Sequence, residues 1–212
     1  MRIFYNILLL FLLPLAMYKL YWPKAGKPSV GKRWPEHFGV SKKVSSVDVW
    51  FHAVSVGEVL AAIPLITQLK QQKPQCNILL TTTTATGAEQ AQSKLADLVI
   101  HRYAPFDLWP CIRWFLHLHK PKQLWIMETE LWPNMLHQCR QRGIPVLVAN
   151  ARLSAKSAAG YQKVARLSRA MLHDVHTIAA QNNRDGERFV ELGLPKDKLA
   201  ITGSIKFDLD LN

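Results

Sequence analysis

The sequence predicts an α/β domain, a mostly parallel sheet with helices on both faces, preceded by an apolar helix at the N-terminus. Three observations support this. Short apolar runs alternate with amphipathic stretches beyond residue 46, an uncharged apolar run fills residues 3–18, and the 212 residues suffice for one sizeable domain. Strands that alternate with helices of this length are typical of parallel sheets covered on both faces.

The N-terminal segment is expected to be a membrane anchor. No charged residue occurs from Ile3 to Tyr18. A helix of that length measures about 24 Å at ~1.5 Å per residue, somewhat less than the ~30 Å hydrocarbon core of a bilayer. Pro14 is expected to kink or split the helix, because proline lacks the amide hydrogen that a helix interior uses. A shallow or marginally spanning anchor over residues 1–22 therefore fits better than a complete transmembrane helix.

A cleaved signal peptide is the alternative interpretation of this segment. Only Arg2 precedes the apolar run and no A-x-A-like cleavage site follows, so the sequence favours an uncleaved anchor. Basic residues after an apolar segment hold that flank on the cytoplasmic side, and aromatic residues settle at headgroup depth. We therefore expect the domain to lie in the cytoplasm against the membrane. The basic and aromatic residues that follow the apolar run are Tyr18, Lys19, Tyr21, Trp22, Lys24, Lys27, Lys32 and Arg33.

Beyond the anchor, the apolar pattern predicts seven strands. They occupy residues 47–53, 77–82, 98–103, 123–127, 145–149, 177–180 and 199–202. Amphipathic stretches between them predict helices at residues 60–71, 88–95, 131–142, 160–172 and 184–192. No strand-to-helix turn carries G-x-G-x-x-G or G-x-x-x-x-G-K-[ST], which weighs against dinucleotide binding and P-loop chemistry.

The first strand runs into H-A-V-S-V-G-E, which delivers Glu58 to the start of a helix. A carboxylate at that point is stabilised by the helix dipole and by free amides, so one interpretation is purely structural. The other interpretation is a catalytic base, because open α/β sheets bind their ligands at the carboxyl ends of the strands. Segments further along the chain favour the second interpretation.

Other strand ends bring polar residues to the same edge. M-E-T-E-L-W-P-N places Glu128 and Glu130 beside an indole, either as helix caps or as part of a sugar site. N-A-R-L-S adds Arg152, which suits bidentate contact with phosphate or an ion pair with a nearby glutamate. G-S-I-K-F-D adds Lys206. The loop T-T-T-T-A-T-G at residues 81–87 carries hydroxyls that suit sugar or phosphate oxygens, although a plain Thr-rich strand end is the simpler interpretation.

The amino-acid composition narrows the classes of partner that the chain is expected to bind. The net charge of +12 suits an anionic membrane or a phosphorylated ligand, and no block of five or six basic residues predicts a nucleic-acid tail. Cys76, Cys111 and Cys139 lack C-x-x-C spacing, so we expect packing roles and no structural zinc. His117 and His119 point to different faces of a helix and are predicted to be surface histidines. No metal or cofactor is expected.

In this order and spacing, the motifs resemble the N-terminal half of the 3-deoxy-D-manno-octulosonic acid (Kdo) transferases that act on lipid A. The resemblance covers essentially the whole chain, including the apolar start and K-R-W at residues 32–34. It implies a two-domain glycosyltransferase of the GT-B type at the cytoplasmic face of the inner membrane. Such an enzyme transfers Kdo from CMP-Kdo to the bis-phosphorylated lipid A precursor (lipid IVA) during lipopolysaccharide biosynthesis.

The resemblance also implies roles for individual residues. Glu58 corresponds to the proton acceptor, and Glu128 and Lys206 correspond to residues associated with transition-state stabilisation. Residues 23–212 would form the acceptor-binding Rossmann-like domain, and the donor-binding C-terminal domain is expected to be absent from this chain. The candidate substrate-binding residues are Ser55, Gly57, Thr84, Thr86, Gly87, Glu130 and Arg152.

Two functional hypotheses follow from these observations. The chain is the N-terminal part of a Kdo transferase, or it is a membrane-tethered module that holds the lipid A precursor without transferring a sugar. A downstream reading frame for a second nucleotide-binding α/β domain would favour the first hypothesis. A nucleic-acid-binding role is not supported, because aromatic residues are not interleaved with basic ones on any predicted face.

Overall fold

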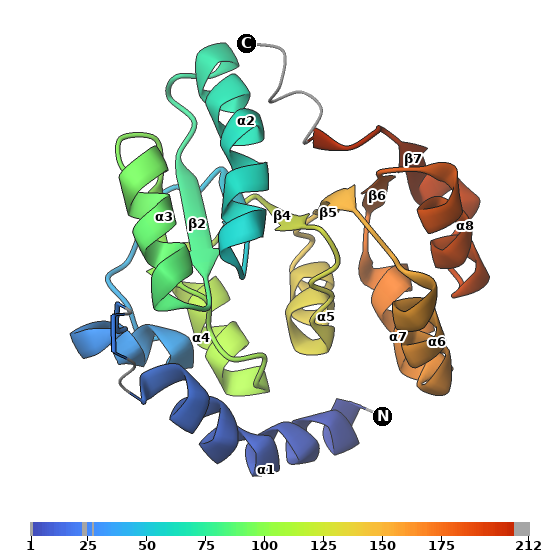
Figure 1. The fold of residues 1–212 in the computed structure, drawn as a ribbon, viewed down its shortest axis with the longest axis horizontal. Helices are drawn as coiled ribbons and strands as arrows, with labels where there is room; N and C mark the ends of the chain where they lie inside the picture. The colour runs from blue at the N-terminus through green and yellow to red at the C-terminus, as the bar shows by residue number, and fades with distance from the viewer. Residues whose placement is uncertain (1, 23–24, 27, 206–212) are drawn as a thin grey trace.

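A seven-stranded parallel sheet lies at the centre of the molecule (Figure 1). The structure is a computed structural model that describes residues 2–22, 25–26 and 28–205. The strands lie in the order β3-β2-β1-β4-β5-β6-β7, and every neighbouring pair is parallel, which confirms the predicted fold class. Their bounds are β1 (Val49–His52), β2 (Ile78–Thr82), β3 (Ile100–Tyr103), β4 (Gln123–Met127), β5 (Val146–Ala151), β6 (Thr177–Ala180) and β7 (Leu199–Ile201).

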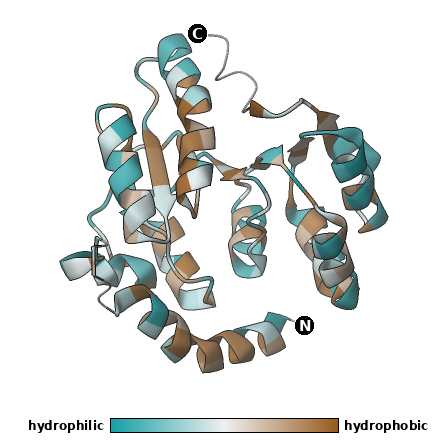
Figure 2. Cartoon of the chain, viewed as in Figure 1, coloured by the Kyte–Doolittle hydropathy of each residue, from teal (hydrophilic) through white to brown (hydrophobic). Residues whose placement is uncertain are grey.

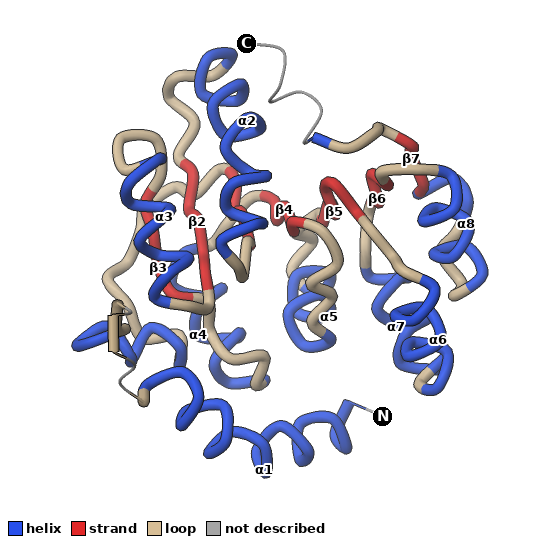
Figure 3. The backbone as a smooth tube through the Cα atoms, in the orientation of Figure 1, coloured by secondary structure: helices blue, strands red, loops and turns tan. Residues whose placement is uncertain are grey.

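Helices flank the sheet on both faces (Figure 3). One face is covered by α2 (Val56–Gln72) and α3 (Ala85–Leu95). The predicted helix at residues 160–172 is instead two helices, because Val164 has φ −120° and ψ 37° and interrupts the helical backbone. The helices of the other face are α4 (Trp109–His119), α5 (Pro133–Gln141), α6 (Ala155–Lys163), α7 (Ala165–Asp174) and α8 (Asn183–Glu191), and a short 3-10 turn η2 (Lys196–Lys198) precedes β7.

Alternate side chains of each strand enter two separate cores. Val49 and Phe51 of β1 pack with α2 and α3, whereas Trp50 between them packs with α4 and α5. This division follows from the period of two along a strand, which sends successive side chains to opposite faces. The three cysteines are buried in agreement with packing roles. His119 contradicts its prediction as a surface histidine: it is 1% exposed.

The burial of His119 has a tertiary cause. Its Nε2 lies 2.9 Å from the hydroxyl of Ser41, and its Nδ1 accepts a 3.2 Å hydrogen bond from the backbone N–H of Val44. Both partners come from the segment that precedes β1, so helical spacing alone does not reveal them. His117 is exposed, as predicted.

The strand order reverses between β1 and β4. From β1 the chain proceeds outward through β2 to β3, and it then returns to the centre at β4 and proceeds through β5 to β7 on the other side. The carboxyl ends of β1 and β4 therefore lie side by side at a topological switch point. Ligands of open α/β sheets bind in the crevice at such a point.

The apolar N-terminal segment forms α1 (Arg2–Tyr21), which runs beneath α4 and α5 in Figure 1. Pro14 lies inside this helix and does not end it; α1 curves along its length (Figure 1). By length and composition α1 is able to cross a membrane. Its side chains leave much apolar surface uncovered: Ile3 is 79% exposed and Phe11 is 79% exposed. Figure 2 shows the middle of α1 as a hydrophobic stretch.

A 3-10 helix, η1 (Gly31–Phe38), follows and contains the K-R-W residues. Arg33 binds Glu36 through two hydrogen bonds of 3.0 and 2.8 Å, and the Glu36 carboxylate accepts the Tyr103 N–H at 2.7 Å. This pair joins η1 to β3. Gly39 ends η1 with φ +82°, and a Cβ there would lie 2.5 Å from the Cys111 carbonyl oxygen, so only glycine lets η1 approach α4.

Candidate functional site

Glu58 lies at the carboxyl end of β1, in the first turn of α2. Ser55 caps this helix: its Oγ accepts a 3.3 Å hydrogen bond from the Glu58 N–H and donates a 2.8 Å hydrogen bond to Glu58 Oε1. The other carboxylate oxygen accepts the Val54 N–H at 2.9 Å. The arrangement is a variant of the capping box, in which the carboxylate accepts the N–H of Val54 in place of that of the N-cap Ser55, and it agrees with the structural interpretation of Glu58.

The electrostatic surroundings of Glu58 go beyond what a cap requires. Its side chain is buried, with 6% exposure. Burial, together with repulsion from Glu130 and Glu128, raises its pKa to about 7, although the hydrogen bonds from Val54 and Ser55 oppose this rise. A carboxyl group with a pKa near the working pH is suited to accept a proton from a hydroxyl.

Glu128 and Glu130 follow β4, on the other side of the switch point. Glu128 has a left-handed backbone with φ 57°, and its N–H donates a 2.9 Å hydrogen bond to the Ala149 carbonyl. Such a conformation is strained for a residue other than glycine, and strain of this kind gathers at functional sites. The Glu130 carboxylate accepts a 2.9 Å hydrogen bond from the indole of Trp132, the residue that precedes α5.

His52 is a site residue that the sequence reasoning missed. It ends β1, is fully buried and stands edge-on to Trp132 with ring centres 4.5 Å apart. Its Nδ1 lies 3.0 Å from the Thr81 hydroxyl, while no partner of its Nε2 lies among the described residues. Burial lowers its pKa to about 3, so the imidazole is neutral. The available signal was its position, directly at a strand end in H-A-V-S-V-G-E.

The hydroxyl-rich loop begins α3. Thr84 caps that helix by accepting the Gly87 N–H at 3.1 Å, and its hydroxyl lies 3.2 Å from that of Thr86. The Thr83 hydroxyl donates a 2.8 Å hydrogen bond to the Val54 carbonyl, next to the Glu58 turn. The simpler interpretation of this loop, a strand end with a glycine turn, therefore describes its local structure.

Asn150 lies near the end of β5, and Arg152 directly follows this strand. Asn150 has φ 53°, and its Oδ1 accepts a 3.3 Å hydrogen bond from the Ile205 N–H. The Arg152 side chain is exposed and forms no ion pair within the described part of the chain, while its carbonyl accepts a hydrogen bond from the Thr129 hydroxyl. Lys206 lies outside the described residues.

The structure thus brings Ser55, Glu58, Glu128 and Glu130 together at the switch point, where two acidic side chains act on the pKa of a third. Arg152 follows the next strand of the same edge. Among the described residues, no group of three or more His, Cys, Asp or Glu side chains is arranged to hold a metal ion. The arrangement offers proton-transfer chemistry at the carboxyl edge of the sheet.

A family model and curated relatives point to one family. A family model described as 3-deoxy-D-manno-octulosonic-acid transferase (kdotransferase) matches residues 32–209. The 3-deoxy-D-manno-octulosonic acid transferase of Haemophilus influenzae is 43% identical over 214 residues, which cover 100% of this chain and 50% of the relative. A probable mitochondrial 3-deoxy-D-manno-octulosonic acid transferase of Arabidopsis thaliana is 35% identical over 198 residues, which cover 92% of this chain and 44% of the relative.

The chain therefore spans about half the length of the curated relatives it matches. Solved structures show the fold alone. The UDP-GlcNAc 2-epimerase of Neisseria meningitidis, bound to UDP-GlcNAc, aligns with a TM-score of 0.56 at 14% identity, over 76% of this chain and 48% of its own. The S. aureus MnaA–UDP structure aligns with a TM-score of 0.58 at 13% identity, over 76% of this chain and 46% of its own.

Proposed function

The chain belongs to the 3-deoxy-D-manno-octulosonic acid transferase family, and on that premise we propose that it is the acceptor-binding half of an inverting glycosyltransferase. The reaction moves Kdo from CMP-Kdo to a hydroxyl of the lipid A precursor (lipid IVA) in lipopolysaccharide biosynthesis. One observation carries the proposal: a buried carboxyl with a pKa of about 7, Glu58, stands at the switch point of the sheet.

Glu58 is proposed to be the general base. As the acceptor oxygen forms a bond to the anomeric carbon of Kdo, the ionised carboxylate takes the hydroxyl proton, and CMP leaves with the bonding electrons. Inversion follows because attack and departure occur on opposite faces of the sugar. Positioned general-base help contributes roughly 10²–10⁴-fold to such a step. The hydrogen bonds from Ser55 and Val54 fix the direction in which the carboxylate oxygens point.

Glu128 and Lys206 are proposed to stabilise the transition state. Lys206 supplies a positive charge for the departing CMP or for the donor carboxylate, and Glu128 supports developing positive charge on the sugar or orients Lys206. The repulsion that Glu128 and Glu130 exert on Glu58 supports a shared site. Contacts with substrate are assigned to Ser55, Gly57, Thr84, Thr86, Gly87, Glu130 and Arg152.

The acceptor is proposed to arrive from the membrane. α1 is long and apolar enough for a bilayer and lies beside the loops at the carboxyl edge of the sheet, where Asn6 accepts the Trp109 N–H at 3.3 Å. We place residues 1–22 in the inner membrane as an anchor and the domain of residues 23–212 on its cytoplasmic side. The donor CMP group is assigned to a second, C-terminal domain, in keeping with relatives about twice as long as this chain.

A transfer assay tests the proposal. The chain alone, and a chimera of the chain with the C-terminal half of the Haemophilus influenzae relative, are incubated in detergent with CMP-Kdo and lipid IVA. We expect product from the chimera and none from the chain alone, which would then be a precursor-binding module by itself. Glu58→Gln in the chimera is expected to lower transfer at least about a hundredfold. Normal turnover of that variant would remove Glu58 from the mechanism.

A further inference from the structure

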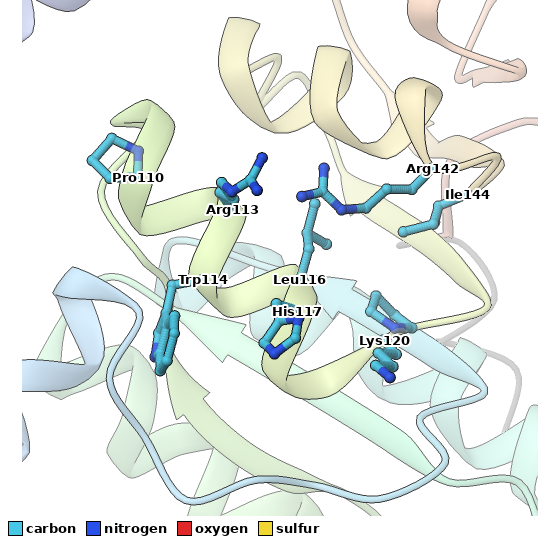
Figure 4. A pocket seen from close by; sticks show the side chains of 9 residues that line it. Pro110, Arg113, Trp114, Leu116, His117, Lys120, Arg142 and Ile144 are labelled. Carbon is cyan, nitrogen blue, oxygen red and sulfur yellow. The ribbon is translucent and has the colours of Figure 1, made fainter.

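A groove between α4 and α5 forms a cavity of about 730 Å³ (Figure 4). Small-molecule sites in proteins typically have volumes of ~300–1,000 Å³, so the cavity is large enough to hold a ligand. Lys120 of its lining comes just before β4, and Arg142 and Ile144 come just before β5. These positions are at the amino ends of the strands, the opposite edge of the sheet from Glu58. The groove is thus separate from the candidate site.

The lining of the groove is positively charged. Arg113, Lys120 and Arg142 contribute three positive charges, and no lining residue is acidic. Figure 4 shows the guanidinium groups of Arg113 and Arg142 extending toward each other across the groove. No ion pair involving any of these three cations occurs among the described residues. Like charges that face each other repel, and an anion between them replaces that repulsion by attraction.

Arg142 is held in place before any ligand binds. Its Nη1 donates hydrogen bonds of 3.1 Å to both the carbonyl and the side-chain oxygen of Gln138. Gln138 in turn donates a 2.8 Å hydrogen bond to the Trp109 carbonyl at the start of α4. The two helices that form the groove are therefore bridged by the side chain that orients Arg142. A preorganised guanidinium loses less conformational freedom when it binds an oxyanion.

The remainder of the lining is apolar and aromatic. Trp114 is 51% exposed, and its ring lies 5.9 Å from that of His117 on the same helix. Leu116 and Ile144 add apolar surface within the groove. Arginine and lysine favour phosphate oxygens, whereas an exposed indole favours an apolar or planar group. This combination selects an amphipathic ligand that carries phosphate.

We propose that the groove between α4 and α5 binds the phosphate of an amphipathic anion, at a second site independent of sugar transfer at Glu58. Arg113 and Arg142 bind the phosphate oxygens from opposite sides, Lys120 adds charge, and Trp114 covers the apolar part. Two sources supply this chemistry, the headgroup of an anionic lipid and a soluble phosphorylated compound. Binding of either ligand is expected to weaken as the salt concentration rises, because the charges of Arg113, Lys120 and Arg142 are exposed to solvent.

The test measures binding to the full chain in neutral detergent or on vesicles. Inorganic pyrophosphate is titrated calorimetrically, and flotation compares phosphatidylcholine vesicles with vesicles that also contain phosphatidylglycerol. The groove variant is Arg113→Gln with Lys120→Gln. The matched control, Lys94→Gln with Arg184→Gln, removes the same charge from exposed positions of α3 and α8.

We expect the groove variant to weaken binding of at least one anionic probe tenfold or more, and the control to weaken it less than twofold. Trp114→Phe is expected to abolish most of the change in tryptophan fluorescence that the probe causes. Pyrophosphate binding identifies a soluble ligand as sufficient; a preference confined to phosphatidylglycerol vesicles identifies a lipid headgroup. Equal losses in both variants, or no binding of pyrophosphate together with no preference for phosphatidylglycerol, overturn the proposal. Vesicle binding through α1 alone appears as equal flotation with both lipid mixtures.

Discussion

The hydroxyl of Tyr5 donates a 2.9 Å hydrogen bond to the carboxylate of Asp107, a residue 102 positions further along the chain. Asp107 is buried and also accepts the backbone N–H groups of Asn134 and Met135 at 2.9 and 2.8 Å, in the first turn of α5. Asn6 adds a second contact, because its side-chain oxygen accepts a 3.0 Å hydrogen bond from the side-chain Nδ2 of Asn134. An otherwise apolar helix is thus fastened to the domain by polar groups on one side.

Tyr5→Phe is expected to loosen this attachment. The substitution removes one donor from a buried carboxylate, and a hydrogen bond to a charged group contributes about 1.5–3 kcal/mol. We expect a loss of that size in the free energy of unfolding and faster proteolysis between α1 and η1, both measured in detergent. Tyr18→Phe is the matched control, because Tyr18 is 56% exposed. Equal effects of the two variants would contradict an attachment through Asp107.

The raised pKa of Glu58 predicts how stability depends on pH. The folded chain holds this proton more tightly than the unfolded chain, since the pKa rises from 4.5 to about 7. The contribution of Glu58 to the free energy of unfolding is therefore complete below pH 4.5 and is lost as pH rises through 7. Between pH 4 and pH 8 this group is expected to lower the free energy of unfolding of the wild type by on the order of 2–3 kcal/mol. Glu58→Gln is expected to lack this decrease. Chemical unfolding at both pH values measures it.

The comparison between wild type and Glu58→Gln isolates this group, because burial also raises the pKa of Asp107 to about 7 and both proteins contain that residue. If the unfolding free energies of wild type and variant change in parallel with pH, the pKa of Glu58 is not raised.

Transfer by the proposed chimera is expected to follow the same titration. A general base must be ionised, so the rate should rise tenfold per pH unit below about pH 7 and level off above it. In Glu58→Gln the residual rate should show no such rise. A profile of the unsubstituted chimera that is flat between pH 5.5 and pH 8 would show that another group accepts the proton.

The sequence was sufficient for the features that depend on local pattern. Short apolar runs between amphipathic stretches located the strands, and the carboxyl-edge position of Glu58 followed from the strand that precedes it. Contacts between segments that are distant in the chain could not be predicted from the sequence. His119 is buried by Ser41 and Val44, and Asp107 is engaged by Tyr5 and the start of α5. Neither partner set has a fixed spacing, so no periodic pattern reveals it.

Asn150 is expected to position the segment that leads to Lys206. Its side-chain oxygen accepts the Ile205 N–H, while its φ of 53° is one that asparagine and glycine tolerate best. Asn150→Gly retains the backbone conformation and removes the hydrogen bond. We expect faster hydrogen exchange at the Ile205 amide and a lower transfer rate in the chimera, with β5 otherwise protected as before. Unchanged exchange at Ile205 would show that the contact does not hold this segment.

Glu128 offers a test that separates function from strain. Its φ of 57° costs a residue with a Cβ about 1–2 kcal/mol, more than the ~0.4–1 kcal/mol that glycine loses through greater freedom of the unfolded chain. Glu128→Gly is therefore expected to raise the free energy of unfolding by up to about 1 kcal/mol, whereas Glu128→Ala retains the strain. If Glu128 stabilises the transition state, both variants lose transfer at least about tenfold in the chimera. A glycine variant that is more stable and equally active would leave the carboxylate with no catalytic role.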